Sequence, residues 1–429
     1  MIWIYNVFLT LSSLFWAPWM LLRAKKRKEA VIWKERSGDY PFQLKKGEPR
    51  LWLHAVSVGE VVAAIPILRA VRELEPGLEI VLSVTTSSGH QTAREQAAPL
   101  FDHLVYYPID VYRFVLSGLV RVRPTVFAVM ETELWLNFLD AAQNIGTKTI
   151  LVNGRISDRS FPRSKAIAFF YRDLLKRMDR CLMQSQTDAD RIKRLGGQNV
   201  EVFGNCKFDQ AIEGLDADQN HWRAELGLDP LLPVIVIGST RGEFEEKFVV
   251  EAIKSLEAQV IWAPRHLERA GAVETLCESS GHPVALRSQN GRISDLGRNT
   301  PQSPVLVLDS YGELSQVYAV ADVVVIGGGF DNLGGQNLIQ PLAHGKPVLH
   351  GKNMQNFKDV AEAAGHSGCS ISVESPAELG EQLRLLLQDK PRREKMAASA
   401  TALVQQNLGA SKRYAAAIVA AATRSNLAG

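Results

Sequence analysis

Short apolar runs rich in β-branched residues recur along the whole chain, and most are followed by a stretch with helical periodicity. In Val61–Leu74, for example, the apolar residues Val61, Ile65, Leu68 and Val71 stand three or four positions apart. Strands that alternate with helices predict βαβ units and parallel sheets. The strand candidates of the first half are Leu51–Val56, Glu79–Thr86, His103–Tyr107, Thr125–Glu131, Thr147–Asn153, Cys181–Gln184 and Val200–Phe203.

The alternation is interrupted between residues 209 and 233 and then starts again. This segment is more polar and contains Gly214, Pro230 and Pro233, so we expect an interdomain linker. Near the C-terminus, Pro376–Ala428 predicts two or three helices. The strand candidates of the second half are Val234–Gly238, Gln259–Ala263, Pro283–Arg287, Val305–Leu308, Val323–Ile326 and Pro347–Leu349.

Two halves of similar layout predict an α/β protein with two Rossmann-like domains, each built on a doubly wound parallel sheet. The expected bounds are 23–208 and 234–429, with the linker at 209–233. A chain of 429 residues also exceeds the roughly 250–300 residues at which single cores stop growing. Ligands of open α/β sheets bind beyond the carboxyl ends of the strands, so we expect the functional site there, in a cleft between the domains.

The first 22 residues form a segment of their own. No charged residue occurs between Ile2 and Leu22, and a run of about 20 residues is long enough to span a bilayer core. By the positive-inside rule, the basic cluster that follows keeps the rest of the chain on the cytoplasmic side. We predict a membrane-anchor helix over residues 1–22; a helix that lies in the membrane interface or docks on the protein is the alternative. The basic cluster consists of Arg23, Lys25, Lys26, Arg27 and Lys28.

Composition adds mainly exclusions. The net charge of +3 provides no basic field for nucleic acid. The four cysteines are far apart and form no C-x-x-C pair, and the nine histidines show no H-x-x-x-H spacing. We therefore expect no nucleic-acid partner and no metal site.

Glu60 is the first candidate for chemistry. The segment Leu51–Glu60 runs from a strand through Ser57 and Gly59 into a helix, which places a carboxylate at the helix start. The helix dipole stabilises a negative charge there by about 0.3–1 kcal/mol. A carboxylate that only caps main-chain amides is the alternative, and the segment by itself favours it.

A pair of carboxylates, Glu131 and Glu133, follows the strand candidate that ends near Val129. We expect only one of the two side chains to face the site. A solvent-exposed pair is the alternative. Further along, Arg155 and Arg159 occur in a loop of small polar residues, which suits an anionic ligand as well as a solvated loop.

In the second half, four segments follow strand candidates at their carboxyl ends. They are Gly238–Glu243, Trp262–Arg269 with Arg265, Asp309–Leu314 with Glu313, and the glycine-rich run Gly327–Pro341. Main-chain amides at the turn Gly238–Glu243 could bind phosphate. In the glycine-rich run, the five glycines let the main chain approach a ligand closely, and the N-terminus of the following helix attracts phosphate. A flexible loop is the alternative for this run, and Gly238–Glu243 is neither a P-loop nor a dinucleotide fingerprint.

Together these motifs resemble one family, the 3-deoxy-D-manno-octulosonic acid (Kdo) transferases of lipopolysaccharide assembly. The resemblance covers nearly the whole chain, and eight motifs occur in the order and at the spacing of that family. They are His54–Glu60, Glu131–Trp135, Asn153–Ser157, Gly204–Asp209, Gly238–Thr240, Pro264–His266, Gly312–Leu314 and Gly334–Asn337.

The resemblance implies the GT-B fold and an inverting, metal-independent transfer of Kdo. The implied donor is CMP-Kdo and the acceptor is a lipid A precursor, lipid IVA, at the cytoplasmic face of the inner membrane. No cofactor is implied. Glu60 is the implied proton acceptor, and Glu131 could orient the acceptor or tune Glu60. The implied CMP contacts are Pro264, Arg265, Tyr311, Gly312, Glu313, Asn337, Leu338, Ile339 and Gln340.

Four positions depart from the family pattern. Gln336 and Gln340 stand where the family usually has His and Glu, Leu136 replaces a proline, and Arg241 a histidine. A neutral Gln340 would bind nucleotide hydroxyls more weakly than a carboxylate does. Two alternatives therefore stay open: a GT-B enzyme that uses another nucleotide sugar, and a non-catalytic membrane scaffold with the same fold. The number of Kdo residues added and the oligomeric state cannot be predicted.

Overall fold

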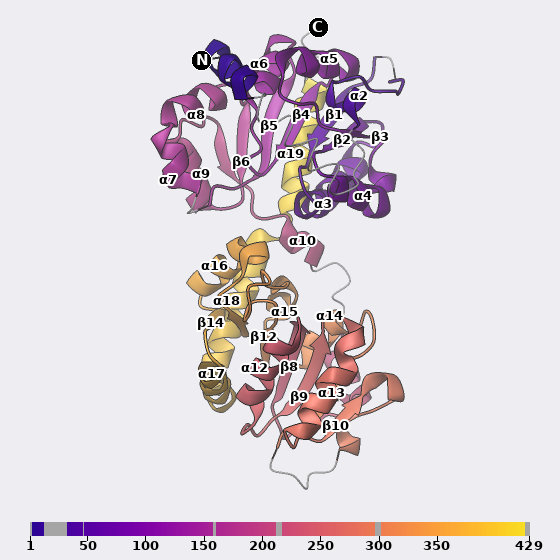
Figure 1. Cartoon of the computed structure of the whole chain (residues 1–429), viewed down its shortest axis with the longest axis vertical. Coiled ribbons are helices and arrows are strands. Elements are labelled where there is room, and N and C mark those ends of the chain that lie inside the picture. The colour runs from indigo at the N-terminus through magenta and orange to yellow at the C-terminus, as the bar shows by residue number, and fades with distance from the viewer. Residues whose placement is uncertain are drawn as a thin grey trace. The chain divides into compact units, whose positions relative to one another are not determined.

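The computed structural model describes residues 2–12, 32–45, 47–157, 160–211, 217–296 and 302–424. The chain forms two compact units (Figure 1), one from Met1–Gln210 with Asn407–Gly429 and the other from Ala211–Gln406. Each unit is built on a seven-stranded, wholly parallel sheet with helices packed on it. The predicted α/β class, with two doubly wound parallel sheets, is confirmed.

The first sheet has the strand order β3-β2-β1-β4-β5-β6-β7, in which the chain starts at the centre, moves to one edge and then returns to build the other. All seven strands coincide with predicted ones to within two residues at either end. They are β1 (Arg50–His54), β2 (Glu79–Val84), β3 (His103–Tyr106), β4 (Val126–Met130), β5 (Lys148–Gly154), β6 (Arg180–Met183) and β7 (Val200–Val202).

Helices cover both faces of this sheet. One face packs on α3 and α19 through an apolar cluster that includes Val61, Leu68 and Ile418. The other face packs on α5, α6 and α9 around Trp52, Phe127 and Phe138. The helices of the unit are α2 (Trp33–Arg36), α3 (Val58–Leu74), α4 (Ser87–Gln96), α5 (Tyr112–Val122), α6 (Leu136–Asn144), α7 (Ser160–Ala166), α8 (Ala168–Leu175), α9 (Gln186–Arg194), α10 (Lys207–Ala211) and α19 (Ala410–Arg424).

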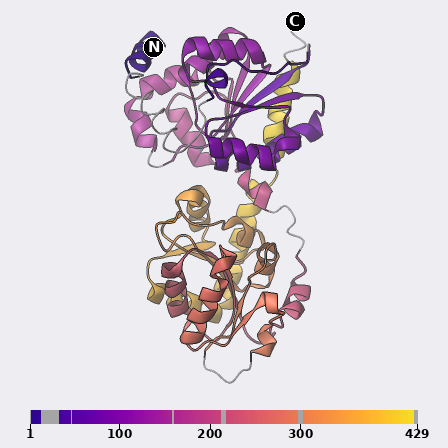
Figure 2. The same ribbon diagram turned by 45° about the vertical axis from the view of Figure 1, so that its right-hand side comes forward.

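The last helix, α19, joins the first unit although it ends the described chain. It packs against α3 and the strands β1, β4 and β5, and appears as the yellow helix beside this sheet in Figures 1 and 2. The Tyr414 hydroxyl donates to the Gly204 carbonyl (2.9 Å), and Asp209 accepts the amides of Gly409 and Ser411 (both 2.7 Å). The predicted second domain, 234–429, included this helix, whereas the compact units place it with the first. The bounds 23–208 and 234–429 stay a prediction.

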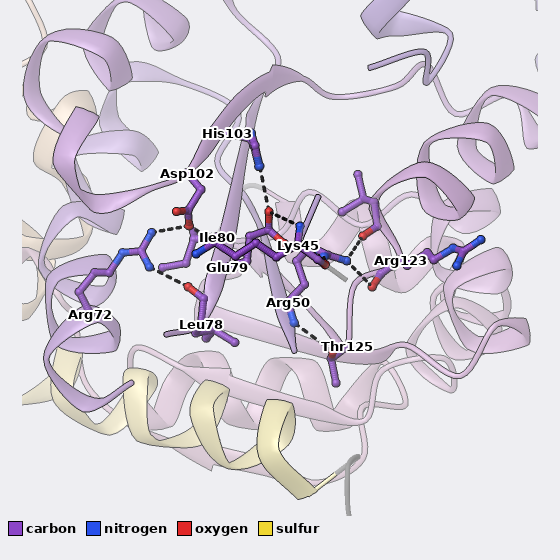
Figure 3. Close-up of polar contacts among 11 residues, drawn as sticks. Lys45, Arg50, Arg72, Leu78, Glu79, Ile80, Asp102, His103, Arg123 and Thr125 are labelled. Carbon is purple, nitrogen blue, oxygen red and sulfur yellow. Dashed lines mark hydrogen bonds and ion pairs between the residues drawn. The ribbon is translucent and has the colours of Figure 1, made fainter. Parts of the chain in front are cut away.

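A buried ion pair lies at the amino-terminal ends of two inner strands of the first sheet (Figure 3). Arg50 and Glu79 open the neighbouring strands β1 and β2, and the Arg50 Nη2 atom lies 2.6 Å from Glu79 Oε2, with side-chain exposures of 5% and 2%. The same guanidinium donates to the carbonyls of Val122 (2.6 Å) and Lys45 (2.8 Å). Arg50 therefore links the end of α5 and the loop before β1 to the amino-terminal ends of the strands, opposite the expected site.

The second sheet has the order β10-β11-β9-β8-β12-β13-β14. Its strands are β8 (Val234–Thr240), β9 (Gln259–Pro264), β10 (Val284–Leu286), β11 (Val305–Val307), β12 (Val323–Ile326), β13 (Val348–Gly351) and β14 (Ser370–Val373). Only the edge strand β14 was not predicted. Its helices are α11 (Gln219–Glu225), α12 (Glu243–Ile253), α13 (Ala270–Ser279), α14 (Leu314–Val317), α15 (Ile339–Ala343), α16 (Lys358–His366), α17 (Pro376–Gln388) and α18 (Lys390–Asn407). Helix α11 falls within the predicted linker 209–233.

The N-terminal segment is described over residues 2–12, which are helical. Residues 13–22 of the predicted anchor and the basic cluster Arg23–Lys28 lie outside the described residues. Within the described parts of the chain, no helix combines the length and the apolar character needed to cross a bilayer. The helix at residues 2–12 leaves an apolar stripe in solvent, formed by Trp3, Ile4, Val7, Phe8 and Leu11.

Candidate active site

Glu60 lies in the first turn of α3, just beyond the carboxyl end of β1. Its Oε2 atom accepts the amide N–H of Val56 (2.9 Å), and its Oε1 atom accepts the Ser57 hydroxyl (3.1 Å). Glu60 therefore does cap a main-chain amide, that of Val56. A carboxylate has about four lone-pair sites, and these two hydrogen bonds occupy two of them, so Glu60 can still accept a proton. The residue keeps 8% of its surface exposed.

The two carboxylates after β4 act on Glu60 together. β1 and β4 are neighbours in the sheet, so the loop at 131–135 emerges next to the start of α3. Glu131 adopts a left-handed φ of 56°, so the chain leaves the strand there and its side-chain alternation stops. Glu131 and Glu133 both raise the pKa of Glu60 through their negative charge, and the expectation that only one of them faces the site stays a prediction.

Burial and these charges make Glu60 a much weaker acid than an ordinary glutamate. Removal of the carboxylate from water is the largest cause and Glu131 the next, and together they raise the pKa of Glu60 to about 8. The pKa of Glu133 is also raised, by burial and by Glu131. Lys207, which follows β7, places its Nζ atom 3.8 Å from Glu131 Oε1. A carboxyl group that titrates near neutral pH is suited to proton transfer.

In the second unit, the four segments singled out in the sequence start at the carboxyl ends of four adjacent strands, in the order β11-β9-β8-β12. The ends of β9 and β8 are joined by a hydrogen bond from the Arg265 amide to the Thr240 carbonyl (3.0 Å). Arg265 and Tyr311 extend into solvent, and Tyr311 is 85% exposed. The structure therefore brings the predicted CMP contacts to one edge of one sheet.

The glycine-rich run is organised by a carboxylate that the sequence analysis missed. Glu245, in the first turn of α12, is fully buried. Its Oε2 atom accepts the amides of Arg241 and Gly328 (both 2.7 Å), and its Oε1 atom accepts those of Phe330 (3.0 Å) and Asp331 (3.4 Å). An internal anion therefore occupies these amides, including that of Arg241 in the turn Gly238–Glu243, where phosphate was expected to bind. The phosphate site expected at the start of the helix after the run stays a prediction.

Close contact between main-chain segments explains the glycine at the start of this run. A Cβ atom on Gly327 would lie 2.5 Å from the Cα atom of Thr240, so the end of β12 can approach the end of β8 only without a side chain. Gly328 has a φ of 78°, which a side chain would strain. The run is a shaped turn around Glu245, so the alternative of a flexible loop is not supported.

The remaining predicted CMP contacts differ in whether their side chains or only their main-chain groups are accessible to a ligand. Leu338 and Ile339 bury their side chains in the core, so only their main chain could reach a nucleotide. Asn337 accepts the amide of Ile339 on its own side-chain oxygen (2.9 Å). Pro264 is buried, whereas Gln340 is half-buried at the start of α15.

Glu313 is held by a second residue that the sequence analysis missed. Arg287 Nη2 lies 3.2 Å from Glu313 Oε1 and 2.8 Å from Glu225 Oε1, and the Ser310 hydroxyl donates to the other oxygen of Glu313. Arg287 is preceded only by the short strand β10 and has no motif around it. Lys207 and Glu245 stood inside or beside quoted motifs. Lys207 faces Glu131 across 76 residues, and three of the four amides that Glu245 accepts are 83 or more residues away, so no local pattern marks their roles.

The basic loop after β5 is only partly described. Arg155 is half-buried, whereas Arg159 lies outside the described residues, so their predicted role toward an anion stays a prediction. Among the described residues, no group of three or more His, Cys, Asp or Glu side chains is arranged to hold a metal ion.

Known proteins resemble the chain over most of its length. A family model described as 3-deoxy-D-manno-octulosonic-acid transferase (kdotransferase) matches residues 32–210. A 3-deoxy-D-manno-octulosonic acid transferase of Bordetella pertussis is 33% identical over 380 residues, which covers 85% of this chain and 85% of the relative. A bifunctional glycosyltransferase/methyltransferase of Fusobacterium nucleatum is 30% identical over 393 residues; that match covers 90% of this chain but only 59% of the longer relative.

Solved structures with the same architecture are distant in sequence. A glycosyltransferase from Rickettsia africae has a TM-score of 0.50 at 12% identity and covers 89% of this chain and 97% of its own. A UDP-GlcNAc 2-epimerase from Neisseria meningitidis, bound to UDP-GlcNAc, has a TM-score of 0.52 at 12% identity and covers 83% and 99%. These likenesses show a GT-B-like fold, and the Bordetella relative shows the family. The chain therefore belongs to the 3-deoxy-D-manno-octulosonic acid transferases, a family of glycosyltransferases.

Proposed function

We propose that this protein transfers Kdo from CMP-Kdo to a lipid A precursor, with inversion at the anomeric carbon and with Glu60 as the base. The observation that carries the proposal is the environment of Glu60, a carboxylate whose pKa is raised to about 8 by burial and by Glu131 and Glu133, which follow the neighbouring strand β4. Family membership supports the reaction class, because the relatives are named as Kdo transferases.

A single displacement accounts for the step. The acceptor hydroxyl gives its proton to Glu60 while its oxygen forms a bond to the anomeric carbon of Kdo. The bond from that carbon to the phosphate oxygen breaks, and CMP leaves with the electron pair. A base with a pKa near the working pH combines a useful ionised fraction with a strong tendency to accept a proton. Attack opposite the leaving group inverts the carbon.

Glu131 tunes this base, in our proposal, rather than serving as a second one. Its negative charge raises the pKa of Glu60, and its own charge is partly balanced by Lys207 at 3.8 Å. Lys207 would thus limit how far the pKa of Glu60 rises. A base that titrated far above neutral pH would be protonated most of the time and would turn over slowly.

The second unit supplies the donor site in this proposal. Arg265, exposed at the end of β9, suits the phosphate of CMP, and the exposed ring of Tyr311 offers a surface for a flat base. Glu313 and Gln340 offer acceptors for ribose hydroxyls, and Glu313 is held in place by Arg287. Charge that develops on the leaving phosphate would be met by the guanidinium of Arg265 without a bound metal.

We also propose that the first unit faces the cytoplasmic leaflet of the inner membrane. The N-terminal helix exposes Trp3 (83%), Phe8 (70%) and Leu11 (61%) on one side. A lipid surface is the occupant that we infer for this stripe, because the basic cluster Arg23–Lys28 follows it in the sequence and would be attracted to anionic headgroups. An anchor at this position would keep the enzyme near a lipid acceptor.

The test is release of CMP from CMP-Kdo by the full-length protein with lipid IVA in detergent. Glu60→Gln should bind CMP with unchanged affinity and lose turnover by about 100-fold or more, the usual scale for a general base. Glu73→Gln is the matched control, because Glu73 lies on the same helix and is exposed. Normal turnover of Glu60→Gln would remove the base from the proposal.

A thermal-shift screen separates the competing interpretations. Stabilisation by CMP supports the donor assignment, whereas stabilisation by UDP or ADP and not by CMP would favour a different nucleotide sugar. The departures at Gln336 and Gln340 are the specific reason to run this comparison. Absence of CMP release with CMP-Kdo, together with no stabilisation by any nucleotide, would favour the scaffold.

A further inference from the structure

The N-terminal helix contacts the first unit through the polar groups of Tyr5 and Asn6, while five of its apolar side chains are exposed: Trp3, Ile4, Val7, Phe8 and Leu11. The Tyr5 hydroxyl donates to Asp110 Oδ2 (2.8 Å), and the Tyr5 ring stacks on Phe170 with the ring centres 5.9 Å apart. The side-chain amides of Asn6 and Asn137 donate to each other (both 2.8 Å). The attachment therefore combines ring packing of Tyr5 with long-range hydrogen bonds from Tyr5 and Asn6.

The attachment point is the cap of another helix. Asp110 accepts the amides of Asn137 (3.2 Å) and Phe138 (2.9 Å), which belong to the first turn of α6. The N-cap residue of α6, Trp135, provides no side-chain cap of its own. Asp110 therefore satisfies main-chain donors that would otherwise be unpaired. It is 4% exposed and Asn137 is fully buried, so these bonds lie inside the protein.

Helix α6 begins directly after the loop that carries Glu131 and Glu133. The loop spans only the five residues between Met130, the end of β4, and Leu136, the start of α6. At the strand end it is held by the Glu131 amide, which donates to the Val152 carbonyl (3.0 Å). Because so short a loop can move little without moving one of its ends, the cap of α6 controls where the two carboxylates lie.

We propose that the N-terminal helix, besides any role at a membrane, positions the 131–135 loop through Tyr5 and Asp110, and thereby sets the charge around Glu60. Tyr5 and Asp110 are positioning residues, since neither touches the proposed reacting groups. The charged groups that act on Glu60 are Glu131 and Glu133, and Lys207 faces Glu131. The catalytic consequence rests on the proposed function; the mechanical link between helix and loop does not.

The first measurement is hydrogen–deuterium exchange of the full-length protein, followed by mass spectrometry. Tyr5→Phe keeps the ring stacked on Phe170 and removes one hydrogen bond to the cap. Exchange in peptides that cover residues 131–139 should become about three- to tenfold faster, the effect of one such bond. Ile4→Ala is the matched control, because Ile4 lies one residue away in the chain and is 69% exposed. It should leave this exchange unchanged.

The second measurement is the pH dependence of Kdo transfer with detergent-dispersed acceptor, so that membrane attachment is not at stake. In Tyr5→Phe, kcat should fall about three- to tenfold and the pH at which kcat/KM is half-maximal should move. The KM for CMP-Kdo should stay the same, since the donor residues belong to the other unit. Asn6→Ala should act in the same direction, which guards against a single misfolded variant.

The outcomes are separable. Unchanged exchange at 131–139 in both Tyr5→Phe and Asn6→Ala overturns the proposal whatever the kinetics show. Faster exchange with an unchanged kcat and pH profile overturns the catalytic role of the link. If the wild-type protein releases no CMP, the proposed function fails, and exchange, which needs no substrate, still decides whether the helix holds the loop.

Discussion

Glu245 provides the sharpest test of how the donor side is built, and the variant Glu245→Gln isolates its charge. The substitution keeps the length and shape of the side chain. It replaces one carboxylate oxygen by an NH2 group, which can only donate. Each oxygen of Glu245 now accepts two main-chain amides, so either orientation of the glutamine sets its NH2 group against two N–H donors.

The magnitude follows from that count. Hydrogen bonds to a charged group contribute about 1.5–3 kcal/mol each, so the loss of two costs at least about 3 kcal/mol in the stability of the turn. The two bonds that remain also lose their charge. If CMP binds only the ordered turn, its apparent affinity falls in proportion to the ordered fraction. Since 1.4 kcal/mol corresponds to a factor of ten, we expect Kd for CMP to rise by up to about 100-fold.

Isothermal titration of CMP into the full-length protein measures this effect. Glu243→Gln is the matched control, because Glu243 lies in the same turn of α12 but its side chain is 69% exposed and pairs with Lys247. Its Kd should stay within twofold of the wild type. Exchange of the amides at 328–331 should rise in Glu245→Gln and not in the control. A Kd for Glu245→Gln within twofold of the wild type, in a folded protein, would refute the reasoning.

Two further predictions concern pH and stability. The kcat/KM of the wild type should rise with pH with an apparent pKa near 8, since Glu60 must be ionised to accept a proton. Glu131→Gln should lower this apparent pKa, because one of the charges that raise the pKa of Glu60 is gone. An unchanged apparent pKa would exclude Glu131 from this role. Arg50→Met should destabilise the first unit by about 3–5 kcal/mol in urea, as it leaves Glu79 buried without its main partner. Hydrogen bonds from Arg50 and His103 outweigh burial and lower the pKa of Glu79, so this stabilisation is present above the unfolded carboxyl pKa of about 4.3 and is lost as pH falls through the lower folded value. A difference between wild type and Arg50→Met that stays constant down to pH 2 would contradict that assignment.

The same position in the two units shows how context decides the role of a carboxylate. Glu60 and Glu245 both lie in the first turn of the helix that follows the first strand of their unit, and each accepts the amide four residues before it. Glu245 gains three more amides and is sealed from solvent. Glu60 gains one hydroxyl and two negatively charged neighbours, and its pKa rises to about 8. The sequence around the two residues does not distinguish these outcomes.

The sequence by itself determined the elements, the fold class and the family. Burial selects continuous apolar runs in the strands of parallel sheets and a period in helices, and both are local properties that a chain carries in neighbouring residues. For this reason, thirteen of the fourteen strands in the described part of the chain were predicted. The exception, β14, is an edge strand in which serine alternates with Ile371 and Val373, so it is too polar to stand out as an apolar run.

Only the tertiary structure decided which groups meet. Glu245 contacts amides 83 to 86 residues away, Lys207 faces Glu131 across 76 residues, and Tyr5 reaches Asp110 across 105. The tertiary structure also placed α19 with the first unit, although this helix follows the rest of that unit by more than 190 residues in the chain. Such contacts depend on where whole strands and helices pack, and no local spacing records it. The charge around Glu60, and with it the chemistry proposed for this protein, therefore exists only in the folded chain.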